Sequence, residues 1–276
     1  MNVFEFLLHR YPFIRGRTRL TQLLSQYSRV GAIVQTRDGA WFRILDDPMS
    51  RGIDLFGECE PPHTRLYTAL VAPGDTVVEV GANFGWYTVL FAKLVGSSGR
   101  LITFEPTPSL AECVRESMRL NSVESVATLV ESGLGRDAGE TATVCADAIA
   151  STCKVQRLDE YLKEADIDRV DLIKIDAACF AADVLTGAPN LLARTDAPIV
   201  AFDINPERLK LRGIPLNAAQ RVLADAGYTE FIRLLDDGRT QEGFPVDSAA
   251  SVYGISARPA RAEQLRVAVG RIRQRR

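Results

Sequence analysis

The sequence predicts an α/β protein with a mostly parallel, doubly wound sheet that ends in an antiparallel strand pair and follows an N-terminal helix and hairpin extension. Three observations predict this class. From Thr76 onward, strands rich in β-branched residues alternate with helical patterns. Glycines directly follow the first of these strands, and only a loop joins the last two strands. A chain of 276 residues, 46% of them hydrophobic, can bury a full core as one domain.

The charge balance, the apolar runs and the cysteines argue against several classes of function. The 33 basic and 35 acidic residues give no overall attraction to nucleic acid, and no apolar run reaches the roughly 20 residues that span a bilayer. The five cysteines have no metal-ligand spacing, so we expect no metal site. Their odd number, without a secretory signal, favours a reducing cytoplasm. Nothing in the sequence specifies an oligomeric state.

The first 60 residues are expected to form an extension. Residues 1–30 have a helical pattern, and "GAIVQTRDGAWFRIL" predicts a hairpin with Asp38 and Gly39 in its turn. After the break at Pro61 and Pro62, a helix is expected from about His63. An isolated hairpin is marginal in water, so we expect residues 1–60 to pack beside the sheet of residues 61–260.

The remaining elements follow in order. The predicted strands are 76–80, 101–104, 127–131, 170–175 and 199–204, and the predicted helices are 86–95, 109–121, 158–165, 180–193 and 216–226. The short runs "TATVCA" and "CKVQ" lie between the third strand and the third helix, and "TEFIRLL" and "SVYGIS" predict the final pair. The basic tail, 261–276, is expected to be a solvated helix, with contact to an acidic partner as the alternative.

The turn after the first strand predicts the cofactor. Gly81, Asn83 and Gly85 read G-x-N-x-G, and Trp86 occupies the place of the third glycine that a dinucleotide pyrophosphate needs. S-adenosylmethionine has no phosphate, so it suits this turn better, and NAD(P) remains the weaker rival. The alternative is a tight turn beside solvated acids.

Two acids near this turn are candidate cofactor ligands. Glu79 lies two residues before the first glycine and would approach the ammonium group of the cofactor. Glu105 ends the next strand, where an acid accepts hydrogen bonds from ribose hydroxyls. We therefore expect Glu79, Gly81, Asn83, Gly85 and Glu105 to bind the cofactor.

Four segments resemble the FkbM family of S-adenosylmethionine-dependent methyltransferases: "FGECEP", "VVEVGANFGWYT", "FEPTP" and "RVDLIKIDAACFAADVLTGA". The resemblance implies a class I, Rossmann-like fold and methyl transfer to a hydroxyl of a sugar, glycan or secondary metabolite. It extends from about Leu55 to Glu207, and more loosely to the end of the sequence. The fourth segment departs from the family pattern, because Ala178 and Ala181 replace two glutamates and Cys179 replaces a glycine.

An alcohol that accepts a methyl group must lose its proton, so a base within reach assists the transfer. Asp176 closes the fourth strand and is the first candidate, as base or substrate orienter; the alternative is a helix N-cap. Asp203, which ends the fifth strand, is the second. His63 could act as a base but is more typical of a helix start, and Lys174 is interpreted as a structural or site-edge cation.

The sequence is compatible with two functions. The first is an O-methyltransferase with a small-molecule or glycan acceptor. The second is a cofactor-binding but weakly active or inactive relative that serves as a partner or regulatory subunit. The alanines at 178 and 181 favour the second function, and the retained Asp176 and Asp203 favour the first.

Overall fold

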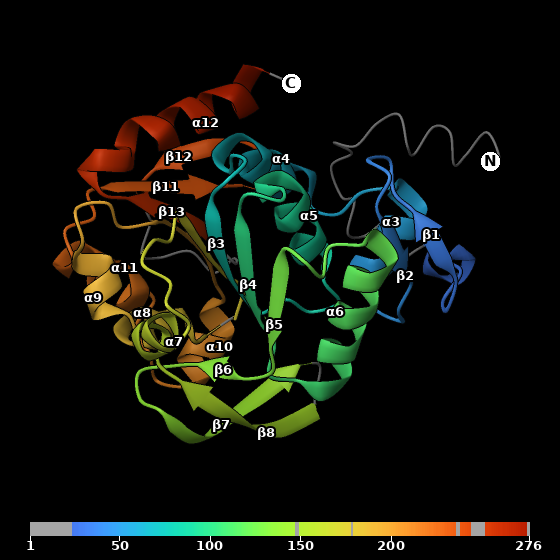
Figure 1. Ribbon diagram of the computed structural model, residues 1–276, viewed down its shortest axis with the longest axis horizontal. Coiled ribbons are helices and arrows are strands. Elements are labelled where there is room, and N and C mark those ends of the chain that lie inside the picture. The colour runs from blue at the N-terminus through green and yellow to red at the C-terminus, as the bar shows by residue number, and fades with distance from the viewer. Residues whose placement is uncertain (1–23, 147–148, 178, 236–237, 244–251, 275–276) are drawn as a thin grey trace.

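The computed structural model describes residues 24–146, 149–177, 179–235, 238–243 and 252–274. Its centre is an eight-stranded, mostly parallel sheet, which confirms the predicted fold class (Figure 1). The parallel strands are β3 (Thr76–Val80), β4 (Arg100–Phe104), β5 (Ala127–Val130), β9 (Leu172–Ile175) and β10 (Ile199–Ile204). Antiparallel pairs then add β13 (Val252–Ala257), β11 (Glu230–Leu234) and β12 (Thr240–Glu242). The strand order is β12-β11-β13-β10-β9-β3-β4-β5.

This order creates a switch point between β3 and β9. The chain runs outward from β3 to β4 and β5, and then returns to the other side of β3 as β9 and β10. Ligands of open α/β sheets bind outside the carboxyl ends of the strands at such a point. Val80 and Ile175 are partners at the ends of β3 and β9, so the residues that follow them lie at the same edge.

Helices cover both faces of the sheet and bury two apolar clusters. One cluster includes side chains of α3 (Pro48–Phe56), α4 (Pro61–Leu70), α5 (Trp86–Val95), α6 (Pro108–Asn121) and α12 (Ala262–Gln274). The other includes side chains of α7 (Leu158–Glu164), α8 (Ala181–Thr186), α9 (Pro189–Ala193), α10 (Pro206–Leu211) and α11 (Ala218–Asp225). None of the described helices is both long and apolar enough to cross a membrane.

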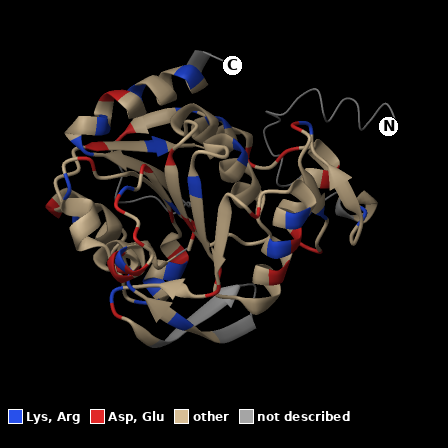
Figure 2. Cartoon of the chain, viewed as in Figure 1, with Lys and Arg blue, Asp and Glu red and all other residues tan. Residues whose placement is uncertain are grey.

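The predicted hairpin is confirmed, since β1 (Ile33–Gln35) pairs antiparallel with β2 (Trp41–Arg43). It lies against α6, where Arg43 forms a 2.7 Å ion pair with Glu116 and Asn121 hydrogen-bonds the backbone of Trp41. Phe42 is buried in the core cluster. Figure 2 shows charges of both signs along α6.

Some local predictions were incomplete. Helix α3 lies in a segment for which no helix was predicted; Asp47 caps it by accepting hydrogen bonds from the Met49 and Ser50 N–H groups. The predicted helix 180–193 is two helices, α8 and α9, because the chain turns at Gly187, where a Cβ would lie 2.1 Å from the Gly135 oxygen. Helix α10 was also missed. The helix predicted over residues 1–30 lies largely outside the described residues, which include the short helix η1 (Ser25–Tyr27).

The solvated character predicted for the basic tail is wrong. Helix α12, which follows the short helix η2 (Pro259–Arg261), buries Leu265 and Ala268 completely and packs on α4. Its residues Arg266 and Arg271 are exposed, and Figure 2 shows basic residues along this helix. The polar stretch after β5 forms a second, three-stranded sheet of β6 (Gly133–Leu134), β8 (Ile149–Gln156) and β7 (Gly139–Ala146).

Candidate active site

A cavity of about 580 Å³ lies at the carboxyl edge of the sheet. The loops after β3 and β9, the ends of β10 and β11, and helices α4 and α5 all contribute to its wall. The polar side chains of the wall are Glu60, His63, Asn83, Tyr87, Lys174, Asp176, Asp203, Arg233, Arg239 and Tyr253. Residues far apart in the sequence therefore meet at the switch point, where the parallel sheet predicts a ligand site.

The glycine turn forms one side of this edge. Gly81 has φ +80°, and a Cβ on it would lie 2.3 Å from the backbone oxygen of Asp176, so only glycine lets the β3 and β9 loops touch. Gly85 has φ +94° and is the N-cap of α5. Asn83 is also left-handed, with φ +55°, and is exposed. This sharp bend places the backbone of residues 81–85 at the carboxyl edge.

Glu105 closes the turn from the neighbouring strand. Its two carboxylate oxygens accept hydrogen bonds of 2.9 Å, one from the Asn83 N–H and one from the Thr107 N–H. The side chain is 3% exposed, and burial raises its pKa although both backbone donors act in the opposite direction. Each oxygen retains a second lone pair, so the carboxylate keeps capacity to accept from two hydroxyls.

Glu79 lies below the site and not on the cavity wall. Its Oε2 accepts hydrogen bonds from Thr88 (2.6 Å) and Thr103 (2.8 Å), and the side chain is fully buried. Its Oε1 lies 3.8 Å from the Nζ of Lys174, its register partner on β9. Burial raises the pKa of Glu79, and the Lys174 charge offsets this only in part.

Lys174 links this buried acid to the cavity. Its Nζ donates to the Gly81 carbonyl at 3.1 Å and lies 3.4 Å from Asp176 and 4.7 Å from the centre of the Tyr87 ring. Burial acts to lower the pKa of Lys174, but the charges of Asp176, Glu79 and Glu60 outweigh it and the pKa is raised. The side chain is therefore an ammonium ion at neutral pH, which fits the interpretation as a site-edge cation.

Asp176 and Asp203 both line the cavity, as their positions at the strand ends predict. Asp176 forms the ion pair with Lys174. Burial raises the pKa of Asp203 to about 7, and the negative charges of Asp176 and Glu60 contribute to the shift. Asp176 does not cap the helix that follows: α8 begins after Phe180 and has no side-chain cap. The N-cap alternative for Asp176 is therefore wrong.

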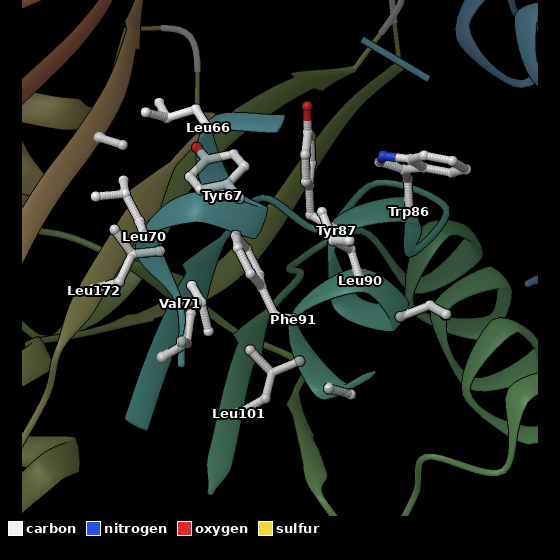
Figure 3. Close-up of a cluster of buried hydrophobic side chains, with 14 of the residues drawn as sticks. Leu66, Tyr67, Leu70, Val71, Trp86, Tyr87, Leu90, Phe91, Leu101 and Leu172 are labelled. Atoms are coloured by element: carbon white, nitrogen blue, oxygen red, sulfur yellow. The ribbon is translucent and has the colours of Figure 1, made fainter. Parts of the chain in front are cut away.

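Helix α4 contributes residues that the sequence analysis did not assign to the site. Glu60, at its start, has φ +39° and accepts a 2.6 Å hydrogen bond from the Tyr87 hydroxyl. Tyr87 and the buried Tyr67 project side by side above Phe91 (Figure 3), with ring centres 5.2 Å apart. The "FGECEP" segment was the available signal, because Glu60 lies within it.

His63 lies on the cavity wall and is 8% exposed. Its ring meets that of Tyr253 edge-on, with centres 4.3 Å apart. Among the described residues, neither ring nitrogen has a hydrogen-bond partner, and the same holds for the Tyr253 hydroxyl. The interpretation of His63 as a helix-start residue was correct for its place in α4 but missed its place in the cavity.

The segment that departs from the family pattern is held by Arg212, the residue that follows α10. Arg212 donates to the Cys179 carbonyl at 2.8 Å, pairs with Asp183 at 3.1 Å and lies 4.1 Å from the centre of the Phe180 ring. Cys179 and Ala181 are buried in the core beneath this segment, and Ala178 lies outside the described residues. The two described replacements therefore serve packing.

Sequence comparison finds methyltransferases. A protein-L-isoaspartate O-methyltransferase of Ignicoccus hospitalis is 31% identical over 119 residues, which are 42% of this chain and 55% of that protein. An arsenite methyltransferase of Halobacterium salinarum is 30% identical over 139 residues, which are 50% of this chain and 34% of that protein. The chain thus spans about half or less of the length of these curated relatives.

Structure comparison finds a putative rRNA methylase of Clostridium thermocellum, with a TM-score of 0.47 and 15% identity over 71% of this chain and 93% of that one. It also finds Aeropyrum pernix fibrillarin in complex with S-adenosyl-L-methionine, with a TM-score of 0.46 and 14% identity over 83% of this chain and 84% of that one.

The family comparison matches more than half of the chain. The pattern described as the methyltransferase FkbM domain covers residues 79–229, from the buried acid of β3 to the start of β11. This range includes the glycine turn, Glu105, Asp176 and Asp203, so the resemblance found in the sequence is confirmed. The chain therefore belongs to the FkbM methyltransferase family and contains an S-adenosylmethionine-dependent methyltransferase domain.

Proposed function

We propose that the protein transfers a methyl group from S-adenosylmethionine to a hydroxyl of a sugar, glycan or secondary metabolite. The observation that carries this proposal is the pair of carboxylates at the cavity, Asp176 and Asp203, one of them paired with a lysine and the other with its pKa near 7. An alcohol needs a base when it attacks, and a base is most effective when its pKa lies near the working pH.

The cofactor supplies an activated methyl group when it is bound. The glycine turn fits this ligand, because residues 81–85 present backbone at the switch point without a third glycine. We assign Glu105 to the ribose hydroxyls, for which its two oxygens keep acceptor capacity. Gly81, Asn83 and Gly85 shape the turn. Glu79 acts from below by pairing with Lys174, which gives it an indirect role in cofactor binding.

In this mechanism Asp203 takes the proton of the acceptor hydroxyl. Asp176, held by Lys174, orients the acceptor by accepting a second hydrogen bond. Holding the oxygen in line with the methyl group supplies much of the rate, because the reacting carbon is already activated. The presence of both acids in one cavity supports an active enzyme over a cofactor-binding subunit without turnover.

The cavity chemistry supports a hydroxylated acceptor. Carboxylates accept hydrogen bonds from hydroxyls, and the imidazole of His63 and the phenol of Tyr253 can both donate and accept. The two rings also offer an apolar surface beside these groups. A polyol ring presents both kinds of surface.

The test has two steps. Calorimetry first measures binding of S-adenosylmethionine, S-adenosylhomocysteine and NADH; the proposal expects the first two to bind and NADH to bind far more weakly. A labelled-methyl screen then compares hydroxylated sugars, glycans and lipids with amines and thiols, and mass spectrometry locates the label. Label on oxygen supports the proposal, whereas label confined to nitrogen or sulfur rejects it.

A further inference from the structure

The cavity has two chemically different ends. Asp176 directly follows β9, and Asp203 is the penultimate residue of the neighbouring parallel strand β10. Two arginines, Arg233 and Arg239, line the cavity from the β11–β12 hairpin at the other side. The strand order places β13 between β10 and β11. The strand that carries Arg233 is therefore separated from the strand that carries Asp203 by β13.

The hairpin holds the two arginines on one face. Leu235 donates its N–H to the Arg239 carbonyl at 2.8 Å, which makes these residues opposite partners beyond the last ladder pair. Arg233 precedes Leu235 by two residues, and side chains two apart on a strand share a face. Arg233 and Arg239 are therefore diagonal neighbours, and the Gly254 partner of Arg233 on β13 leaves space beside it.

Several buried polar atoms of the cavity residues have no hydrogen-bond partner among the described residues. The Nε of Arg233 is buried and, within the described part of the chain, has no hydrogen-bond partner. The two ring nitrogens of the nine-tenths-buried His63 and the hydroxyl of Tyr253 also lack partners, but Tyr253 is opposite Asp203 in the register and so belongs to the acid end of the cavity. Leaving a buried donor without an acceptor is costly, so native proteins rarely do so where no ligand or water binds.

These donors specify the chemistry of the missing group. A guanidinium only donates hydrogen bonds and suits carboxylate or phosphate oxygens, whereas imidazole and phenol also suit hydroxyls. We infer that Arg233 forms an acceptor-recognition subsite for an anionic oxygen group, a carboxylate or a phosphate. The acceptor then carries this group at the arginine end and its reacting hydroxyl at the Asp203 end. The inference rests on the proposed function and narrows its substrate class.

The affinity of sugar probes for the protein saturated with S-adenosylhomocysteine tests this subsite. The probes are D-glucuronate and D-glucose 6-phosphate, with D-glucose as the neutral partner of both, at constant ionic strength in a calorimeter. One charge-assisted contact predicts that at least one anionic probe binds about ten- to a hundredfold more tightly than glucose. The two anionic arms separate a carboxylate from a phosphate ligand. Equal binding of all three probes overturns the inference.

Two variants locate the effect. Arg233→Gln should remove the preference for the anionic probe and leave S-adenosylhomocysteine affinity unchanged. Arg221→Gln, an exposed arginine of α11 outside the cavity, should retain the preference. If Arg233→Gln instead weakens S-adenosylhomocysteine binding, the arginine holds the cofactor carboxylate and the inference fails. Circular dichroism confirms that each variant is folded.

The proposed function and this inference fail in different ways. Methyl transfer to the oxygen of neutral acceptors alone would reject the anionic subsite and leave the proposed function standing. Preferential binding of an anionic probe, lost in Arg233→Gln, would support the subsite even if the label appeared only on nitrogen.

Discussion

Lys174 places its ammonium 3.4 Å from the carboxylate of Asp176, two residues later at the same strand end. The same ammonium lies 3.8 Å from the carboxylate of the buried Glu79. One cation thus neutralises an acid of the core and an acid of the cavity. Asp203 has no ion-pair partner among the described residues, and burial raises its pKa to about 7. Of Asp176 and Asp203, Asp203 is therefore the one suited to accept a proton near neutral pH.

Removing the cation should destabilise the fold. Lys174→Met leaves Glu79 buried without its counter-charge, and breaking a buried pair in this way costs about 3–5 kcal/mol. Urea unfolding at pH 7 measures the loss. The double variant Glu79→Gln with Lys174→Met should recover much of the stability, because no unpaired buried charge remains. A single variant as stable as the unaltered protein would contradict the structural role of Lys174.

Glu105 should control cofactor affinity. Glu105→Ala removes the acceptor for two ribose hydroxyls and leaves the Asn83 and Thr107 N–H groups without their partner. Calorimetry with S-adenosylhomocysteine should show affinity at least tenfold weaker, about the loss of two hydrogen bonds to a charged acceptor. Glu131→Ala serves as the control, because Glu131 is an exposed acid that pairs with Arg115. Unchanged affinity in Glu105→Ala would reject the ribose assignment.

Asp176 should matter for turnover more than for folding. Asp176→Asn removes the charge that faces Lys174 and the acceptor, so the labelled-methyl assay should show turnover reduced about a hundredfold with cofactor affinity nearly intact. The helix α8 has no cap at this residue, so the stability of the helix start should not change. Full turnover in this variant would remove Asp176 from the mechanism.

Asp203 should make the fold less stable as the pH rises. Its folded pKa of about 7 lies above the ordinary value of 3.8, so the folded chain holds the proton more tightly than the unfolded chain. As the pH rises from about 4 to about 7, ionisation of this group lowers the free energy of unfolding by up to about 1.4 kcal/mol per pH unit. Asp203→Asn should match the unaltered protein near pH 4 and exceed its melting temperature at pH 8. A constant difference from pH 4 to pH 8 would show that the pKa is not raised.

Much of the fold could be predicted because its signals are local. The valine run of β3, the glycine turn and the apolar α5 are contiguous, and their predicted bounds agree with the structure. Helix α3 contains a glycine and a serine, which weakened its pattern. In α12 the arginines concealed an apolar stripe of Leu265, Val269 and Ile272 at helical spacing.

The site was predictable only where it follows strand ends. Asp176 and Asp203 could be placed because the carboxyl ends of parallel strands share an edge. His63 and Arg233 reach the cavity through the packing of α4 and the pairing of β11 with β13, which are long-range contacts without a sequence pattern. Glu79 was expected beside the ligand, but its side chain points to the threonines of α5 and β4.

The pH dependence of methyl transfer in the unaltered protein and in Asp203→Asn tests the central claim most directly. With the best hydroxylated acceptor at saturation, turnover of the unaltered protein should rise about tenfold per pH unit below pH 7 and level off above it, since only ionised Asp203 accepts the proton. Asp203→Asn should lose at least a hundredfold at pH 8 and lack this rise. An unchanged profile with full turnover in Asp203→Asn would contradict the assignment of Asp203 as the base.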